Sequence, residues 1–425
     1  MKLLPLLAAL LAGLFSLPAQ AQTGGVTIGA AGAPDASAAL EVRTTTQGLL
    51  LPRLTSDQRA AIASPAAGLL VFQTDNTPGL YYFDGTLWRN LTTGAAPEPR
   101  NLGVVSTLAG SAQGFADGTG AAALFSGPTG VAYDGSGNLY VSEWGNNRIR
   151  KVEVATGVVT TLAGSSSSGS ADGTGPTAQF NLPTGVACDG LGNVYVTEIN
   201  NHRIRKIVAA TGDVTTLAGS TAGFADGTGP AAQFNQPYGV ACDAFGNVFV
   251  ADYGNNRIRR IVAATGVVTT LAGSATSGTV DAIGPAAQFR LPEGVACDAS
   301  GNLYVSEWGN NRIRKIVAAT GTVTTVAGSS QGFADGPGPG ALFYKPTGVA
   351  CDASGNLYVA DFFNYRVRKI VLATGLVTTV AGGTRGFADG PGPSAQFNGL
   401  QSVACNPNGE IYVTDRTNQR VRVIK

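Results

Sequence analysis

Residues 128–164 read PTGVAYDGSGNLYVSEWGNNRIRKVEVATGVVTTLAG, and this stretch decides the fold prediction. Apolar and polar residues alternate in short runs, and glycine, asparagine and aspartate stand between the runs. Alternation with a period of two is typical of β-strands, and these small residues are typical of the turns between strands. The stretch therefore predicts four short strands, at about 130–134, 139–143, 148–153 and 158–163.

The same unit returns along the chain from residue 103 onward. Pro183 follows Pro128 by 55 residues, and Pro237 follows Pro183 by 54. The Pro-x-Gly-Val-Ala anchors begin at Pro128, Pro183, Pro237, Pro292 and Pro346, with a divergent sixth copy at Leu400. Six copies of a four-stranded antiparallel unit predict an all-β, six-bladed β-propeller.

The last copy lacks its fourth strand, because the chain ends at Lys425 after the third. The segment Gly103–Gly110, which precedes the first copy, has the sequence of the missing strand. We therefore expect residues 103–110 to pair with the last blade and to close the ring, which removes an open sheet edge.

The units resemble NHL repeats, a propeller family recognised by Gly-Asn-Leu-Tyr-Val, as at 137–141, followed by Asn-Arg-Ile-Arg-Lys, as at 147–151. The resemblance covers residues 103–425. Only the second copy carries the histidine of the family, as His202. The resemblance implies the fold but does not single out one function. The family includes protein- and RNA-binding modules, and its relatives include calcium-dependent lactonase-like and zinc-dependent lyase propellers.

Composition excludes several classes of protein. The 425 residues are 13% charged and 44% hydrophobic, and the 59 glycines have no three-residue period, which excludes a disordered chain and a collagen. A formal net charge of +1 gives no general attraction for nucleic acid or for an anionic membrane. The single histidine, His202, excludes a histidine-rich zinc site and argues against a Ser-His-Asp triad.

Residues 1–21 are typical of a secretory signal peptide. Lys2 precedes the apolar run Leu3–Leu17, and Ala19-Gln20-Ala21 is a small-x-small cleavage site. The apolar run is short for a membrane-spanning helix. We expect an exported protein, periplasmic or extracellular, with no membrane span after cleavage.

Residues 22–91 are predicted to form a small N-terminal α+β or β module, followed by a linker at 92–102. The predicted elements are strands at 38–43, 48–51 and 68–72, a helix at 55–62 and a hairpin at 79–88 that turns at Asp84-Gly85. The segments 35–42 and 48–54 resemble tail-fibre-type modules of secreted bacterial surface proteins, which tend to trimerise. Since about 70 residues bury little core alone, we expect a homotrimer through this module.

Five cysteines occupy one position of the repeat, on the innermost strand of each blade: Cys188, Cys242, Cys297, Cys351 and Cys405. Equivalent points on neighbouring blades lie beyond the ~7 Å Cα separation that a disulfide allows. We therefore expect free thiols that behave as small buried apolar residues, and no metal cluster.

An acidic residue at the end of each second strand stands opposite the first arginine of the third strand. Such cross-strand pairs favour structural ion pairing over nucleic-acid binding. The predicted pairs are Glu143–Arg148, Glu198–Arg203, Asp252–Arg257, Glu307–Arg312, Asp361–Arg366 and Asp415–Arg420.

Each insert between blades carries an Asp-Gly segment followed by a phenylalanine, as in Asp117-Gly118 and Phe125. One aspartate in a loop is far short of the six to eight oxygens that calcium takes. We expect the aspartate to form an Asx-type turn and the phenylalanine to pack between blades.

Candidate ligand-binding residues lie in the turns between second and third strands, where one position varies while its neighbours repeat. Variable aromatic side chains on a constant scaffold are typical of a recognition surface. The alternative is that each packs on its own insert. The candidates are Trp144, Tyr253, Trp308, Phe362, Tyr365 and His202. A second ring, the x of Pro-x-Gly, is predicted to line the channel mouth and comprises Thr129, Thr184, Tyr238, Glu293, Thr347 and Gln401.

The sequence thus favours an exported, non-enzymatic protein that binds a glycan or a protein through this loop face. No catalytic residue and no cofactor is expected. One alternative is a calcium-dependent lactonase-like hydrolase with Glu293 as its candidate ligand, and another is a structural surface or matrix component.

Overall fold

The computed structural model describes residues 26–29, 40–43, 50–55, 58–59, 62, 65–74, 78–84, 88–91 and 103–425, with backbone only for the first two ranges. The chain divides into two compact units, 1–98 and 99–425. The predicted leader and linker lie outside the described residues. No helix among the described residues is long and apolar enough to cross a membrane.

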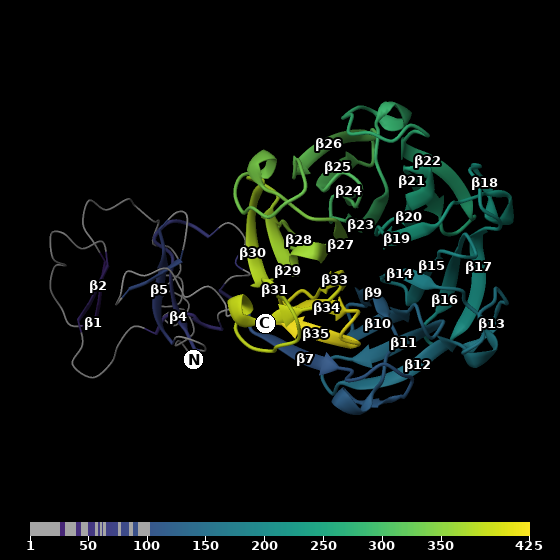
Figure 1. The fold of residues 1–425 in the computed structure, drawn as a ribbon. Coiled ribbons are helices and arrows are strands. Elements are labelled where there is room, and N and C mark those ends of the chain that lie inside the picture. Colours follow the sequence, from purple (N-terminus) through teal and green to yellow (C-terminus); the bar gives the residue numbers. More distant parts are fainter. Residues whose placement is uncertain are drawn as a thin grey trace, which may run out of the picture. The chain divides into compact units, whose positions relative to one another are not determined.

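The second unit is all-β, as the repeats predict, and its sheets are arranged in a ring (Figure 1). Each blade is a four-stranded antiparallel meander whose first strand is innermost. The strands of the first blade are β9 (Pro128–Tyr133), β10 (Asn138–Glu143), β11 (Arg148–Glu153) and β12 (Val158–Gly164). The predicted strand positions therefore match the observed ones within two residues.

The other blades repeat this order. The second has β14 (Pro183–Cys188), β15 (Asn193–Glu198), β16 (Arg203–Val208) and β17 (Asp213–Gly219), and the third has β19 (Pro237–Cys242), β20 (Asn247–Asp252), β21 (Arg257–Val262) and β22 (Val267–Gly273). The fourth has β23 (Pro292–Cys297), β24 (Asn302–Glu307), β25 (Arg312–Val317) and β26 (Thr322–Ala327), and the fifth has β27 (Pro346–Cys351), β28 (Asn356–Asp361), β29 (Arg366–Val371) and β30 (Leu376–Gly382). The remaining sheet is β33 (Leu400–Cys405), β34 (Ile411–Asp415), β35 (Arg420–Ile424) and β7 (Val105–Ala109).

Short elements lie in the inserts and turns. The two-residue strands are β8 (Gly118–Thr119), β13 (Gly173–Thr174), β18 (Gly227–Thr228), β31 (Thr384–Arg385) and β32 (Gln396–Phe397). The 3-10 turns are η1 (Gly120–Ala122), η2 (Gly175–Thr177), η3 (Gly229–Ala231), η4 (Tyr253–Asn255), η5 (Gly284–Ala286), η6 (Gly338–Gly340), η7 (Phe362–Asn364) and η8 (Gly392–Ser394).

Strand β7 comes from the N-terminal end of the unit and pairs antiparallel with β35, the last strand of the chain. The register places Val105 opposite Ile424 and Ala109 opposite Val421. The innermost strands contact one another in sequence, and β33 contacts β9. The two ends of the unit therefore meet within one sheet.

Hydrophobic side chains fill the interfaces between neighbouring blades. Phe125 is fully buried and packs with Leu139 and Val141 of its own blade and with Tyr412 and Val421 of the last. Full burial of one such side chain is worth about 1.5–3 kcal/mol. Equivalent clusters of buried side chains fill each of the remaining interfaces between neighbouring blades.

The predicted ion pairs have the right acid but the wrong arginine. Glu143 lies opposite Arg148 in the strand register, yet its Oε2 accepts from Nη1 of Arg150, 2.8 Å away. Arg148 instead lies over the ring of Phe115, 3.8 Å from its centroid. The observed pairs are Glu143–Arg150, Glu198–Arg205, Asp252–Arg259, Glu307–Arg314, Asp361–Arg368 and Asp415–Arg422.

The second arginine is preferred because it completes a buried polar network. Nη2 of Arg150 donates to Asp117 at 2.6 Å, and the remaining carboxylate oxygen of Glu143 accepts from the backbone N–H of Ser126 and from Asn146. Both Glu143 and Arg150 are fully buried, and a buried charge needs such partners. Asp117, predicted to form an Asx-type turn, is therefore an arginine partner. The network thereby holds in place the insert before β9 and the turn between β10 and β11, the two loops that carry the candidate site.

The first unit contains the parallel pair β1 (Val26–Gly29) and β2 (Leu40–Arg43), and a sheet of β3 (Arg53–Leu54), β4 (Leu70–Gln73), β5 (Gly79–Phe83) and β6 (Trp88–Asn90). The predicted hairpin is observed as β5 and β6, with Phe83 opposite Trp88. No strand includes the described residues 50–51 of the predicted strand at 48–51. Half of the predicted helix lies outside the described residues. Among these residues only Val71 and Tyr81 are buried apolar side chains, so this core is small.

Candidate functional site

Two loops of every blade come together at one end of the strands. In the first blade the backbone N–H of Trp144 donates to Gly127 O and that of Gly145 to Ser126 O, both at 3.0 Å. We call these segments together the loop face. It comprises 126–129 with 144–147, 181–184 with 199–202, 235–238 with 253–256, 290–293 with 308–311, 344–347 with 362–365, and 398–401 with 416–419.

The last residue of the turn joins neighbouring blades in five of the six copies. Asn147 has a left-handed backbone (φ 52°), which asparagine tolerates, and its Oδ1 accepts from the N–H of Leu182 in the next blade at 3.1 Å. His202 occupies the same place, and its Nδ1 accepts from the N–H of Gln236 at 3.1 Å. Burial lowers the pKa of His202, which favours the neutral acceptor form. The structure thus places His202, a predicted ligand-binding residue, in a bond between blades.

Trp308 and Phe362 lie within one aromatic cluster on the fourth and fifth blades. Their ring centroids are 5.5 Å apart, and Phe363 lies 5.9 Å from Trp308 and 4.8 Å from Tyr344. The Nζ of Lys345 lies 4.6 Å from the centroid of Trp308. We call these five residues the aromatic patch. All five side chains are partly exposed, so part of each remains accessible to a ligand.

Sequence comparison among repeats did not single out Tyr344 or Lys345. Both lie in the loop before the innermost strand, where other blades have residues such as Asn235 and Gln236. A sequence signal was present, because these two positions vary between blades as much as the position of Trp308 in the turn between the second and third strands. Tyr365, also predicted, follows the patch at the left-handed position (φ 54°) of its own turn.

Two other predicted aromatic residues contact neighbours on the loop face. Arg416 lies over Trp144, 4.7 Å from its centroid, and Trp144 is still 36% exposed. Tyr253 contacts Tyr238, with centroids 5.8 Å apart. These side chains therefore pack against other loop-face residues.

The three threonines of the predicted channel ring bond to nearby polar groups. Thr129 donates to Gly127 O at 2.9 Å, and Thr184 shares a 3.0 Å bond with Thr197. Thr347 bonds to the carbonyls of Ala360 and Leu400, and it is the one ring member that does not line the central cavity.

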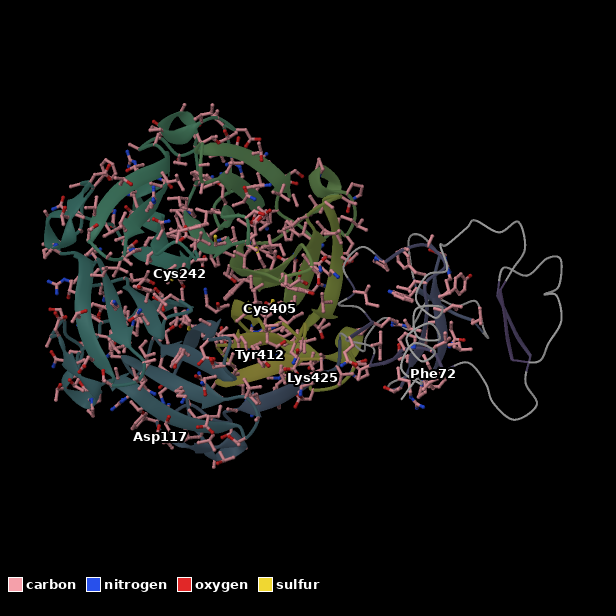
Figure 2. All side chains as sticks on the ribbon, turned by 180° about the vertical axis from the view of Figure 1, so that it is seen from behind. Phe72, Asp117, Cys242, Cys405, Tyr412 and Lys425 are labelled. Atoms are coloured by element: carbon pink, nitrogen blue, oxygen red, sulfur yellow. The ribbon has the colours of Figure 1, made fainter. Side chains whose placement is uncertain are left out.

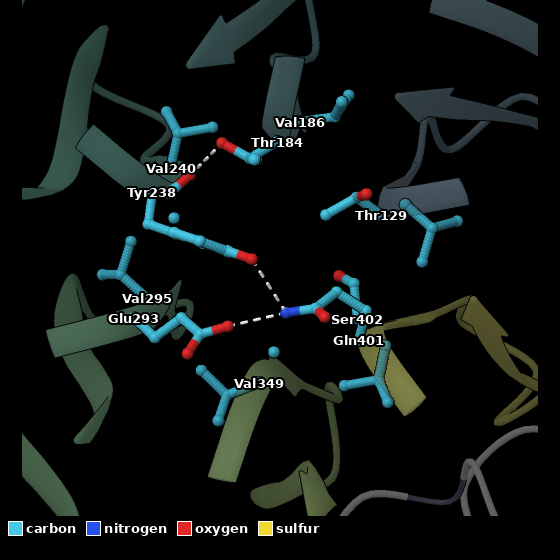
Figure 3. Close-up of a pocket in the computed structure, with 17 residues that line it drawn as sticks. Thr129, Thr184, Val186, Tyr238, Val240, Glu293, Val295, Val349, Gln401 and Ser402 are labelled. Atoms are coloured by element: carbon cyan, nitrogen blue, oxygen red, sulfur yellow. Dashed lines mark hydrogen bonds between the residues drawn. The ribbon is translucent and has the colours of Figure 1, made fainter. Parts of the chain in front are cut away.

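The other three ring members meet across the channel mouth. Nε2 of Gln401 donates to Glu293 Oε1 at 2.6 Å and lies 3.2 Å from Tyr238 OH (Figure 3). They come from three different blades and line a cavity of about 60 Å³. Burial raises the pKa of Glu293 to about 8, against the opposing effects of Gln401, Arg416 and Lys345.

The donor set at this mouth does not fit calcium. Glu293 is the only carboxylate that lines the cavity, and one of its oxygens already accepts from Gln401. Calcium takes six to eight oxygens and favours ionised carboxylates. Among the described residues no three His, Cys, Asp or Glu side chains are grouped to hold a metal ion.

The opposite end of the channel carries the cysteines, and Figure 2 labels Cys242 and Cys405 close to the ring centre. All five thiols are free and partly buried. Burial raises the pKa of Cys297 to about 12, which keeps its thiol protonated. Beside them, Asp134 accepts from Asn138 Nδ2 at 2.7 Å, so the repeated asparagines cap turns there.

Comparison with known proteins agrees with both halves of the chain. The family model described as NHL repeat matches residues 125–152, 180–207, 289–316 and 397–424. The model described as phage tail like trimerisation region matches residues 27–108.

Similar curated proteins share the repeat region. NHL repeat-containing protein 2 of Homo sapiens is 27% identical over 67% of this chain and 44% of its own length. Protein SUPPRESSOR OF QUENCHING 1, chloroplastic, of Arabidopsis thaliana is 28% identical over 67% of this chain and 29% of its own. This chain thus spans less than half the length of these two relatives.

Solved structures share the fold. A structural genomics protein of unknown function from Bacteroides thetaiotaomicron has a TM-score of 0.61 and 22% identity over 83% of this chain and 82% of its own. An auxiliary nutrient binding protein from the same organism has a TM-score of 0.59 and 16% identity over 81% and 82%. A gluconolactonase from Xanthomonas campestris has a TM-score of 0.51 and 14% identity over 84% and 98%. At these identities the likeness shows the fold alone.

The resemblances predicted from the sequence are therefore confirmed: the chain carries NHL repeats in a β-propeller, preceded by a phage tail-like trimerisation region.

Proposed function

We propose that this chain is an exported, non-enzymatic binding protein that recognises a glycan or a protein through its loop face. The observation that carries the proposal is the aromatic patch. Trp308, Phe362 and Phe363 are only partly buried, vary between blades, and stand on loops that a buried ion-pair network holds rigid. Rigid, partly exposed aromatic side chains bind with little loss of conformational entropy.

Further support comes from the N-terminal part of the chain and from a fold relative. The sequence of residues 1–21 favours export, and the trimerisation region at 27–108 would present three propellers together. Three linked sites raise the apparent affinity for a repeating ligand without any new contact. A fold relative named as an auxiliary nutrient binding protein is consistent with this role. We place the mature module at 22–91, the linker at 92–102 and the propeller at 103–425.

The test is binding of the mature full chain to an array of polysaccharides and bacterial surface proteins. Trp308→Ala and Phe362→Ala are expected to lose binding with little change in melting temperature. Phe245→Ala is the matched control, because this phenylalanine is 81% exposed at the opposite end of the third blade. Equal loss in all three variants, or none in any, would contradict the proposal. Absence of binding to every probe would favour a structural surface component.

A further inference from the structure

The loop face is basic at its surface. Its segments contain three permanently charged cations, Arg290, Lys345 and Arg416, and a single acid, Glu293. Glu293 is 3% exposed and lies inside the channel mouth. Within residues 103–425, which the structure describes throughout, none of these three cations takes part in a salt bridge. The salt bridges of this unit are formed instead by six buried arginines and Lys425, which lie outside the loop-face segments: Arg150, Arg205, Arg259, Arg314, Arg368 and Arg422.

Two of these cations lie over indole rings. Lys345 Nζ lies 4.6 Å from the ring centroid of Trp308, and the Arg416 guanidinium lies 4.7 Å from that of Trp144. Each pair combines a positive charge with an indole that is still partly exposed. A ligand that satisfies both carries ring faces and anionic groups close together.

The two pairs flank the channel mouth. The innermost strands follow one another around the ring, which places the fourth blade, with Trp308, opposite the first, with Trp144. Lys345 and Arg416 both act electrostatically on Glu293, so both cations lie near the channel mouth. A linear ligand that crosses the mouth therefore meets an indole and a cation on each side, with Gln401 and Glu293 beneath.

The cavity at the channel mouth can take part of a ligand. Its 60 Å³ holds several water molecules, since one water needs about 10–15 Å³ of such space. A hydroxyl or carboxyl substituent of a ligand therefore fits. Gln401, Tyr238 and Glu293 offer hydrogen-bonding groups to such a substituent.

We propose that the loop face binds an acidic polysaccharide, with uronate carboxylates on Lys345 and Arg416 and pyranose rings stacked on Trp308 and Trp144. This inference rests on the proposed function and specifies its ligand. A nucleic acid fits less well, because it carries one phosphate per nucleotide and needs a continuous basic path, whereas the face has three cations.

The experiment measures binding of the mature full chain to polygalacturonate, alginate and hyaluronate, each beside its carboxyl-reduced, neutral form. An oligothymidylate serves as the nucleic-acid probe. The test variant is Lys345→Gln/Arg416→Gln. The matched control is Lys151→Gln/Lys369→Gln, which removes the same charge from β11 and β29, away from the loop face.

At least one of the acidic polymers is expected to bind at least tenfold more tightly than its neutral form, and more weakly as salt rises. The loop-face double variant loses at least tenfold in affinity, and the control does not. If acidic and neutral forms bind equally, and Trp308→Ala weakens both, this inference would be overturned and the proposed function would stand. Acidic binding that neither the charge variant nor Trp308→Ala weakens would overturn both. Preference for the oligothymidylate, or no binding to any acidic polymer, would also overturn the inference.

Discussion

The carboxyl group of Glu293 is almost completely buried in the folded protein. It is 3% exposed, and burial raises its pKa to about 8, although Gln401, Lys345 and Arg416 act in the opposite direction. In the unfolded chain the same group has a pKa near 4.3. Between these two pH values the carboxyl group is therefore protonated in the folded state and ionised in the unfolded state.

A group with a raised folded pKa contributes stability that is complete below the unfolded pKa and is lost as pH rises through the folded one. We expect the melting temperature of the wild type to fall, relative to that of Glu293→Gln, as pH rises from about 4.5 to about 8, and then to level off. Thermal melts from pH 4 to 9 measure this difference. Glu153→Gln, at an exposed site, is the matched control. A difference that does not change with pH would contradict the assignment.

At the scale of the element, the acid–arginine–aspartate network ties the second and third strands to the insert. Arg150 contacts Glu143 at 2.8 Å and Asp117 at 2.6 Å and has no exposed surface, whereas Arg148 lies at the rim over Phe115. Removal of one partner leaves a buried charge without compensation, which costs about 3–5 kcal/mol.

We therefore expect Arg150→Met to be strongly destabilising and Arg148→Met to cost about 1 kcal/mol or less. Urea midpoints of the two variants and the wild type make the comparison directly. A second change, Glu143→Gln in the Arg150→Met background, is expected to restore part of the loss, because it removes the stranded carboxylate. Equal midpoints for Arg148→Met and Arg150→Met would show that the network is not what holds these strands.

The elements themselves were predictable from the repeat, because period-two alternation and turn residues recur in register six times. The choice between Arg148 and Arg150 was not predictable, since both side chains emerge on the same face of the strand. Their different burial depends on the insert that covers Arg150. In the same way, Trp308 and Phe362 were found because their positions vary. Tyr344 and Lys345 also vary, but only the fold shows that they contact Phe363. The bond from Gln401 to Glu293 joins residues 108 apart in the chain and has no local signal.

At the scale of the whole molecule, the trimerisation region sets the number of binding faces. Its described residues bury few apolar side chains, which is consistent with a module completed by other copies of the chain. We expect the mature chain to have three times the mass of one copy in light scattering coupled to size-exclusion chromatography. A monomer at micromolar concentration would contradict this and would remove the multivalent part of the proposal.

Binding of an acidic polysaccharide across the loop face can be followed through the protein's own tryptophans. Its three tryptophans are Trp88, Trp144 and Trp308, and the last two lie on the loop face. In a Trp88→Phe variant, tryptophan emission therefore reports this face alone, and the change keeps an aromatic ring against Phe83.

The most direct measurement is the emission of Trp88→Phe during titration with polygalacturonate, alginate and hyaluronate, with calorimetry on the same samples. We predict a saturable change in emission whose midpoint equals the calorimetric one, and no such change with the carboxyl-reduced polymers. Calorimetric binding with unchanged emission would place the site elsewhere, and no binding of any of the three acidic polymers would contradict the claim itself.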